Sequence, residues 1–189
     1  MKTIPATRVF ALTMLVLATI GLAFSALIMH DKVQLLLDSS FTPACTLNEV
    51  ISCTDVMQSD QASTFGFANP FLGIIGFPVV MTLAVVLACG IRLPRWIWIA
   101  TAVGLGLGVV FVHYLAYAAV YEIVALCPYC MVVWVVMLAL FVMVVAHLAR
   151  EKRRAAGEDV AHSIFSPALL ILVAWYLGFL AVILEQFVF

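Results

Sequence analysis

Five apolar stretches constrain the fold of this chain more than any other feature of its sequence. They cover residues 9–29, 70–91, 96–121, 127–148 and 167–187, and each is close to the roughly 20 residues that a helix needs to cross a bilayer. Charged residues make up only 10% of the chain, whereas a soluble domain has roughly a quarter. We therefore expect an all-α integral membrane protein, with a four-helix transmembrane bundle and a fifth transmembrane helix.

The first apolar stretch has a second interpretation, because it follows a short basic segment at the N-terminus. A secretory signal peptide also begins with a basic segment, but its apolar core has only about 7–15 residues. The stretch 9–29 is longer than that, so we favour a retained transmembrane helix.

Small residues recur at helical spacing in two of the spans. Gly73 and Gly76 lie near the start of the second span, and Gly104 and Gly108 lie in the third. Glycines at such spacing let membrane helices approach closely. We expect both sets at helix–helix contacts.

Basic residues are distributed unevenly between the two ends of the spans. Only Lys32 lies at one end, whereas the other end holds Lys2, Arg8, Arg92, Arg95, Arg150, Lys152, Arg153 and Arg154. The positive-inside rule places the basic end in the cytoplasm. The N-terminus and the linker 149–166 are then cytoplasmic, and the polar loop 31–69 is extracytoplasmic. The net charge of −1 gives no indication of nucleic-acid binding.

The five cysteines divide by position into a loop pair, a helix pair and a single residue. Cys45 and Cys53 lie in the polar loop, and Cys127 and Cys130 lie at the head of the fourth span. Both pairs fall on the extracytoplasmic side, where disulfides form and persist. Cys89 lies near the opposite end of the second span, and we expect it to be a small apolar filler.

The motif Cys127-Pro128-Tyr129-Cys130 has the local features of a reactive redox pair. Pro128 lacks an N–H and suits the first position of a helix, so Cys127 is predicted to be the N-cap. Cysteines three residues apart share a helix face and can approach closely enough to bond. A sulfur at a helix N-terminus faces unpaired N–H groups and the positive end of the helix dipole, which favour the thiolate.

Two cysteine pairs on one side of a membrane are suited to an electron relay. A thiolate of the loop can attack a helix disulfide and form a mixed disulfide. Electrons would then pass from an external dithiol to Cys45 and Cys53, and on to Cys127 and Cys130. Cys130 lies one helical turn, about 4.5 Å, deeper than Cys127. At that depth the natural electron acceptor is a quinone dissolved in the membrane.

Two other interpretations of these four cysteines are open on residues alone. Both pairs could be structural disulfides, although a bridge within a CxxC motif closes too small a loop to stabilise much. A four-cysteine zinc site has the right ligand type but needs the two pairs in one fixed geometry. We expect no bound metal.

The order of these features resembles the vitamin K epoxide reductase family. A first span is followed by a two-cysteine external loop, two further spans and a CxxC motif that heads a fourth. The segments 53–59, 65–70 and 73–76 are similar to the actinobacterial branch, and the resemblance covers roughly residues 8–148. A DsbB-type enzyme has the same chemistry, but its CxxC precedes the second pair.

The resemblance implies a role for each of the four cysteines. Cys130 would face a quinone, and Cys127 would be its partner and the target of a loop thiol. Cys53 would make that attack, and Cys45 would exchange with an external dithiol. The quinone would be of the menaquinone or ubiquinone type, with vitamin K as a further candidate.

The resemblance also implies residues of a quinone pocket. Asn69 precedes the second span, where its amide would bind a quinone carbonyl; a turn cap is the alternative role. Trp134 lies one turn below Cys130 on the same helix face and would stack on the quinone ring. His113 lies inside the third span, where ionisable residues are costly, and we expect it to be a hydrogen-bonded packing residue.

The sequence therefore predicts a thiol:quinone oxidoreductase of the bacterial cytoplasmic (inner) membrane. It has a catalytic core in 1–148, a basic linker in 149–166 and a fifth transmembrane helix in 167–189. Many bacterial relatives carry a fused thioredoxin-like domain that this sequence does not show, so we expect a separate DsbA-like thioredoxin-fold partner, besides membrane lipid. The alternatives are a quinone or quinone-epoxide reductase, and a non-enzymatic scaffold with structural disulfides.

Overall fold

The computed structural model describes residues 3–38, 40–157 and 167–188. Five helices in this part of the chain are long and apolar enough to cross a membrane. They are α1 (Arg8–Leu37), α3 (Pro70–Ala88), α4 (Arg95–Tyr117, continued by the π-helical turn η2, Ala118–Ile123), α5 (Pro128–Ala155) and α6 (Pro167–Phe187). The predicted all-α membrane fold is confirmed.

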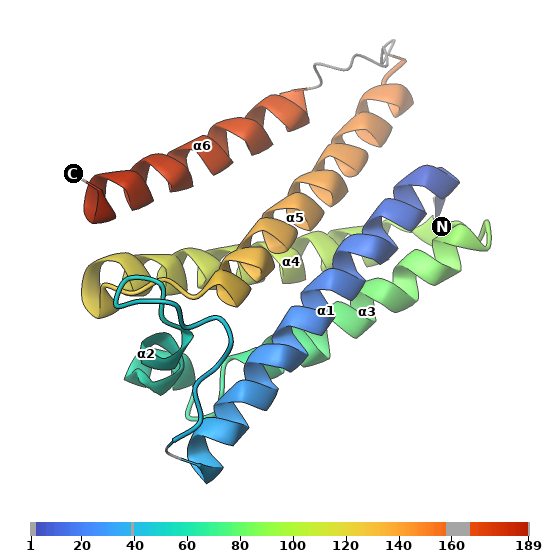
Figure 1. Cartoon of the computed structure of the whole chain (residues 1–189). Coiled ribbons are helices and arrows are strands. Elements are labelled where there is room, and N and C mark those ends of the chain that lie inside the picture. Colours follow the sequence, from blue (N-terminus) through green and yellow to red (C-terminus); the bar gives the residue numbers. More distant parts are fainter. Residues whose placement is uncertain (1–2, 39, 158–166, 189) are drawn as a thin grey trace.

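The first four of these helices form a bundle, and α6 lies on its outside (Figure 1). Helix α1 packs against α3 and α5, while α4 packs against α5. All four contribute to a buried apolar cluster that includes Met14, Phe77, Trp98 and Leu140. Helix α6 contacts α5 and η2 but has no buried residue. Helix α6 is therefore peripheral to the four-helix bundle.

Two helices extend beyond the ends predicted for them. Helix α1 ends at Leu37 rather than at residue 29, because residues 30–37 contain no helix breaker and bury Asp31 and Leu35. The external loop therefore begins at residue 38, not 31; residue 39 lies outside the described part. Helix α5 continues to Ala155 rather than 148, and the basic residues of its last turn complement the negative end of the helix dipole.

The predicted linker 149–166 is thus helical in its first part, and its residues 158–166 lie outside the described residues. Helix α6 runs over Pro167–Phe187, and residue 189 is not described. A short antiparallel pair joins β1 (Thr3–Ile4) to β2 (Leu93–Pro94) at the basic end of the bundle. The sequence reasoning did not predict this pair.

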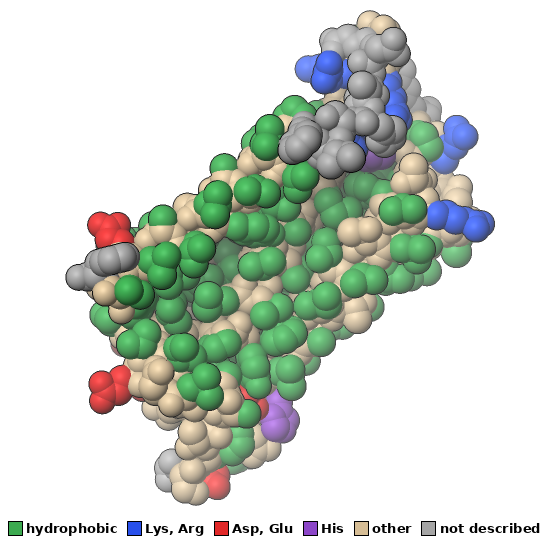
Figure 2. All heavy atoms as spheres, turned by 45° about the horizontal axis from the view of Figure 1, so that its top comes forward, with side chains coloured by type: hydrophobic (Ala, Val, Ile, Leu, Met, Phe, Trp, Pro, Cys, Tyr) green, Lys and Arg blue, Asp and Glu red, His purple; other side chains and the backbone are tan. Residues whose placement is uncertain are grey.

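The external loop contains α2 (Cys53–Gln58) and the 3-10 turn η1 (Asp60–Ser63). Ser52 caps α2 by accepting a hydrogen bond from the Asp55 N–H at 3.2 Å. Figure 2 shows Lys and Arg side chains gathered at one end of the molecule and Asp and Glu at the other, with an apolar surface between. This separation is the pattern on which the predicted orientation depends.

The α1–α3 contact is built on glycines. A Cβ atom at Gly21 would overlap the ring of Phe77, and one at Gly73 would overlap the side chain of Ser25. The prediction that Gly73 permits a close helix contact is therefore confirmed. Small residues allow the two backbones to approach as membrane helices do when packing drives their association.

Replacing Gly21 with alanine should lower the melting temperature of the detergent-solubilised protein. The added methyl group forces Phe77 out of its position, and overpacking of this kind costs about 1–3 kcal/mol. Gly178→Ala in α6 is the matched control, because nothing lies within 4 Å of a Cβ at that position. Equal melting temperatures for the two variants would contradict the tight α1–α3 contact.

Candidate active site

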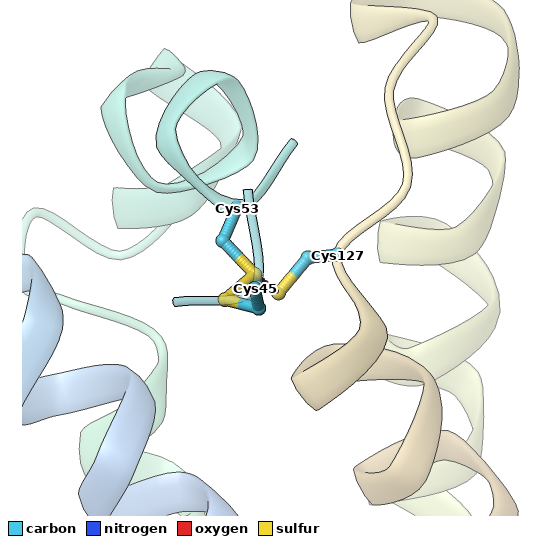
Figure 3. A group of neighbouring side chains, drawn as sticks. All are labelled: Cys45, Cys53 and Cys127. Carbon is cyan, nitrogen blue, oxygen red and sulfur yellow. Dashed lines mark hydrogen bonds between the residues drawn. A yellow bond between two sulfur atoms is a disulfide. The ribbon is translucent and has the colours of Figure 1, made fainter. Parts of the chain in front are cut away.

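Three of the four predicted cysteines meet where the external loop touches the start of α5 (Figure 3). Cys45 and Cys53 form a disulfide, and the sulfur of Cys127 lies 3.0 Å from the sulfur of Cys53. All three side chains are buried, with 5%, 0% and 1% of their surfaces exposed. The free thiol of Cys127 is thus in contact with one sulfur of the loop disulfide.

Cys130 lies one turn further along, in the first turn of α5. Its N–H donates a hydrogen bond of 3.4 Å to the sulfur of Cys127, which is the N-cap of the helix. Pro128 occupies the first helical turn. The predicted N-cap is confirmed, and Cys127 and Cys130 are both free thiols.

The surroundings of Cys127, which precedes the first residue of α5, favour its thiolate. A hydrogen bond from the Cys130 side chain is the main reason that the pKa of the Cys127 thiol is lowered, and the N–H groups of Cys130 and Tyr129 act in the same direction. Burial and the negative charge of Asp31 oppose this shift. A larger thiolate fraction makes Cys127 a better nucleophile toward the adjacent disulfide.

A parallel backbone bridge holds the loop against the start of α5. The Leu126 N–H donates to the Val50 carbonyl at 2.7 Å, and the Ser52 N–H donates to the Leu126 carbonyl at 3.0 Å. Ser52 and Leu126 immediately precede Cys53 and Cys127. This bridge, which we call the clasp, therefore sets the two sulfurs side by side.

The connection that leads into the clasp has an unusual backbone. Residues 118–123 form the π-helical turn η2, and Val124 then adopts the left-handed conformation with φ of 53°. A β-branched residue is strained in that region, and such strain often accompanies functional sites, as π-helical turns do. The connection between α4 and α5 is therefore a helical turn followed by one strained residue.

A cavity of about 900 Å³ begins beside the helix cysteines. Cys127, Cys130, Asn69 and Trp134 line one end, and Trp96 in the first turn of α4 lines the other. Most of the lining side chains are apolar. The cavity follows α3 and α4 through most of the apolar thickness of the bundle.

Two of the predicted contact glycines widen this cavity instead of bringing helices together. A Cβ atom at Gly76 or Gly104 would meet nothing within 4 Å, and both residues line the cavity. The prediction of close helix contacts is wrong for these two positions. At Gly108, by contrast, a Cβ would lie 3.0 Å from the side chain of Met137.

A sequence profile of the Vitamin K epoxide reductase family matches residues 12–145. The chain belongs to this family. A comparison with curated proteins finds no significant match. Family membership makes the protein a multi-pass membrane oxidoreductase, and members of the family use quinones in general. The matched region holds Cys45, Cys53, Cys127 and Cys130 and helices α3 and α4, whereas α6 lies beyond it.

Asn69 lines the cavity, but its side chain is partly occupied in this member of the family. Its Oδ1 accepts from the Thr64 N–H at 3.1 Å, and its Nδ2 donates to the Gln61 carbonyl at 2.7 Å. It does not cap α3 through its side chain. Each of its polar atoms can still form one further hydrogen bond. Asn69 can therefore bind a ligand while it keeps its hydrogen bonds to Thr64 and Gln61.

Two more tethers hold the segment around η1, whose residues Gln61 and Ala62 line the cavity. The Lys32 ammonium donates to the Ala62 carbonyl at 3.2 Å and to the Ser63 hydroxyl at 2.9 Å. On the opposite side, the Gln61 amide donates to the Glu122 carboxylate at 2.7 Å. Sequence reasoning missed these tethers, because they join residues far apart in the chain.

The structure also bears on the fifth cysteine and on the alternative of a metal site. Cys89 is the C-cap of α3, and its side chain is exposed instead of filling the core as predicted. Cys45, Cys53 and Cys127 have sulfurs within 4.8 Å of one another, as metal ligands would. Two of these sulfurs are bonded to each other, so the cluster presents a single thiol rather than a ligand set.

Replacing Cys130 with alanine should trap a bridge between Cys53 and Cys127. The Cys127 thiolate attacks the neighbouring Cys53 sulfur and releases Cys45 as a thiolate. The variant lacks the Cys130 thiol that would displace Cys53 from Cys127, and alkylation of the released Cys45 prevents its return to Cys53. Peptide mapping of the alkylated, non-reduced protein by mass spectrometry would detect the bridge. A bridge from Cys45 to Cys127 in its place would contradict the assignment, and wild-type protein is the control.

Proposed function

We propose that this family member oxidises a separate DsbA-like thioredoxin-fold protein and passes the electrons to a membrane quinone. The observation that carries the proposal is the 3.0 Å contact between the sulfurs of Cys53 and Cys127. It joins a disulfide in the external loop to a dithiol that borders an apolar cavity. If both cysteine pairs were structural disulfides, a free thiol in contact with one of the disulfides would not be required.

The outer exchange begins at Cys45. A thiolate of the partner attacks this sulfur, forms a mixed disulfide and releases Cys53 as a thiolate. The second thiol of the partner loses its proton and attacks the partner's own sulfur in the mixed disulfide. The partner leaves oxidised, and Cys45 and Cys53 are then both reduced.

The inner exchange transfers the same two electrons to the helix pair. The Cys53 thiolate attacks Cys127 of an oxidised Cys127–Cys130 pair and releases Cys130. Cys45 then attacks Cys53, which restores the loop disulfide and releases Cys127. Two protons follow the electrons and leave Cys127 and Cys130 as thiols. This product has the same bonds as the structure, in which the loop pair is oxidised and the helix pair reduced.

The cavity has the chemistry that a quinone requires. Its volume of about 900 Å³ exceeds what the ring alone needs. Trp134 offers an aromatic face for the ring, and Asn69 retains an amide hydrogen for a carbonyl oxygen. The chemistry that a quinone supplies here is the acceptance of two electrons and two protons from the Cys127–Cys130 dithiol. Quinones are more oxidising than ordinary protein dithiols, which sets the direction.

The charge distribution supports a location in the bacterial cytoplasmic membrane with the cysteines outside. Figure 2 shows the Lys and Arg side chains of the described residues gathered at one end of the bundle. In α5, the basic residues lie in the last turn, whereas Cys127 caps the opposite end of the helix. Lys32 is the exception, and it is held by η1 beside the cavity. By the positive-inside rule the cysteine end faces the oxidising compartment, where a disulfide-forming partner works.

The purified protein should reduce quinone when a reduced thioredoxin-fold protein is the electron donor. Cys130→Ala should lower turnover by at least about 100-fold, because it removes a thiol that must react in every cycle. Cys89→Ala is the control and should keep full activity. Quinone reduction followed by absorbance is the measurement. Folded wild type without turnover would favour a scaffold with structural disulfides.

Filling the cavity should weaken the use of long-tailed quinones selectively. In Gly104→Leu the new side chain occupies space along α4, and we expect the KM for a long-tailed quinone to rise about five- to tenfold. The matched control is Val110→Phe, which enlarges a side chain on the exposed face of the same helix. Equal KM values for wild type and Gly104→Leu would contradict this use of the cavity.

A further inference from the structure

Helix α6 makes two side-chain hydrogen bonds to the bundle. The Trp175 indole N–H donates to Nε2 of His113 on α4 at 2.8 Å. The Tyr176 hydroxyl donates to the Val135 carbonyl on α5, also at 2.8 Å. Hydrogen bonds between helices are among the interactions that associate membrane helices. α6 is therefore docked in one orientation.

The bonds of His113 define the state of its ring. Its Nδ1 lies 2.7 Å from the Val109 carbonyl oxygen, which can only accept, so Nδ1 carries the hydrogen. The indole of Trp175 can only donate, so Nε2 is the acceptor. The ring is hydrogen-bonded at both nitrogens, as expected for a packing residue. It does not line the cavity, whereas the preceding residue, Val112, does.

A row of rings leads from this hydrogen bond to the cavity wall. Phe179 lies one helical turn after Trp175, and its ring centre is 5.2 Å from that of His113. On its other side, the ring centre of Phe179 is 6.2 Å from that of Trp134. Phe179 does not line the cavity, whereas Trp134 does. Phe179 therefore supports Trp134 from outside the cavity.

Trp134 and Cys130 belong to the same packed cluster as Phe179. Its other members come from α4, η2 and α5, so α6 contributes Phe179 alone. Aromatic pairs at such separations have preferred orientations. A change in the position of Phe179 is therefore transmitted to the ring that borders the helix thiols.

We propose that α6 is a positioning element of the quinone pocket, in which Trp175 and Phe179 hold the Trp134 ring beside Cys130 and so set the affinity for quinone. This inference rests on the proposed function. It assigns the residues of α6 to substrate affinity, and not only to anchorage in the membrane. Neither Trp175 nor Phe179 lies within the region that the family profile matches.

The test compares two variants of this row with a control on the same helix. Phe179→Ala removes the ring behind Trp134, and Trp175→Phe removes the bond to His113 but keeps a ring. Tyr176→Phe removes a hydrogen bond of the same length that ends at Val135, which does not line the cavity. All three weaken the docking of α6, but only the first two disturb Trp134.

The dissociation constant of a short-tailed quinone is measured by equilibrium dialysis, beside the melting temperature of each variant. We expect it to rise about three- to tenfold in Phe179→Ala and about two- to threefold in Trp175→Phe. Tyr176→Phe should keep the wild-type constant. In quinone-free protein with 5-fluorotryptophan, Phe179→Ala should also shift the fluorine resonance of Trp134, assigned with Trp134→Phe.

Lower melting temperatures with unchanged dissociation constants in all three variants would show that α6 is an anchor and overturn the inference alone. An equal rise in all three would also overturn it, because Tyr176 would then act as strongly as the aromatic row. Wild-type protein that binds and reduces no quinone would overturn the proposed function, and this inference with it.

Discussion

The contact between the sulfurs of Cys53 and Cys127 is the interaction on which the rest of the site depends. Disulfide exchange requires two sulfurs in contact, and these come from a loop and a helix 74 residues apart. The clasp of Val50, Ser52 and Leu126 fixes that contact through the backbone, independently of side-chain identity. The clasp also accounts for the strained backbone of Val124, because this residue ends the turn that brings Leu126 to the clasp.

The bilayer imposes the second constraint: in the proposed function, disulfide exchange takes place on the polar side of the membrane, whereas the quinone is dissolved in its apolar interior. Cys127 and Cys130 stand at this boundary, because the N-terminus of a membrane helix is where unpaired N–H groups meet apolar surroundings. The cap favours the thiolate at Cys127, while Cys130 lies one turn deeper beside the cavity. One helical turn thus spans the distance between the loop disulfide and the apolar part of the bundle.

Sequence reasoning succeeded where the signal is local. Hydropathy located the five spans, and Pro128 identified Cys127 as an N-cap, because each depends on neighbouring residues. It could not find the clasp, since a bridge of one residue pair has no periodicity. Sequence reasoning misassigned Gly76 and Gly104. A glycine at a close helix–helix contact and a glycine that lines a cavity cannot be distinguished in a sequence. The docking of α6 through Trp175 was also invisible, as it depends on which helix faces His113.

The burial of the loop disulfide limits electron exchange with small molecules in solution. Cys45 and Cys53 have 5% and 0% of their surfaces exposed, and the Cys127 thiol has 1%. Small thiols and oxidants in the surrounding solution collide with exposed sulfur but have little access to sulfur buried in this way. In the proposed function, electrons would then enter through a protein that docks and displaces the loop. The burial would insulate the proposed relay, so that its redox state would follow its protein and quinone partners and not the small molecules of the compartment.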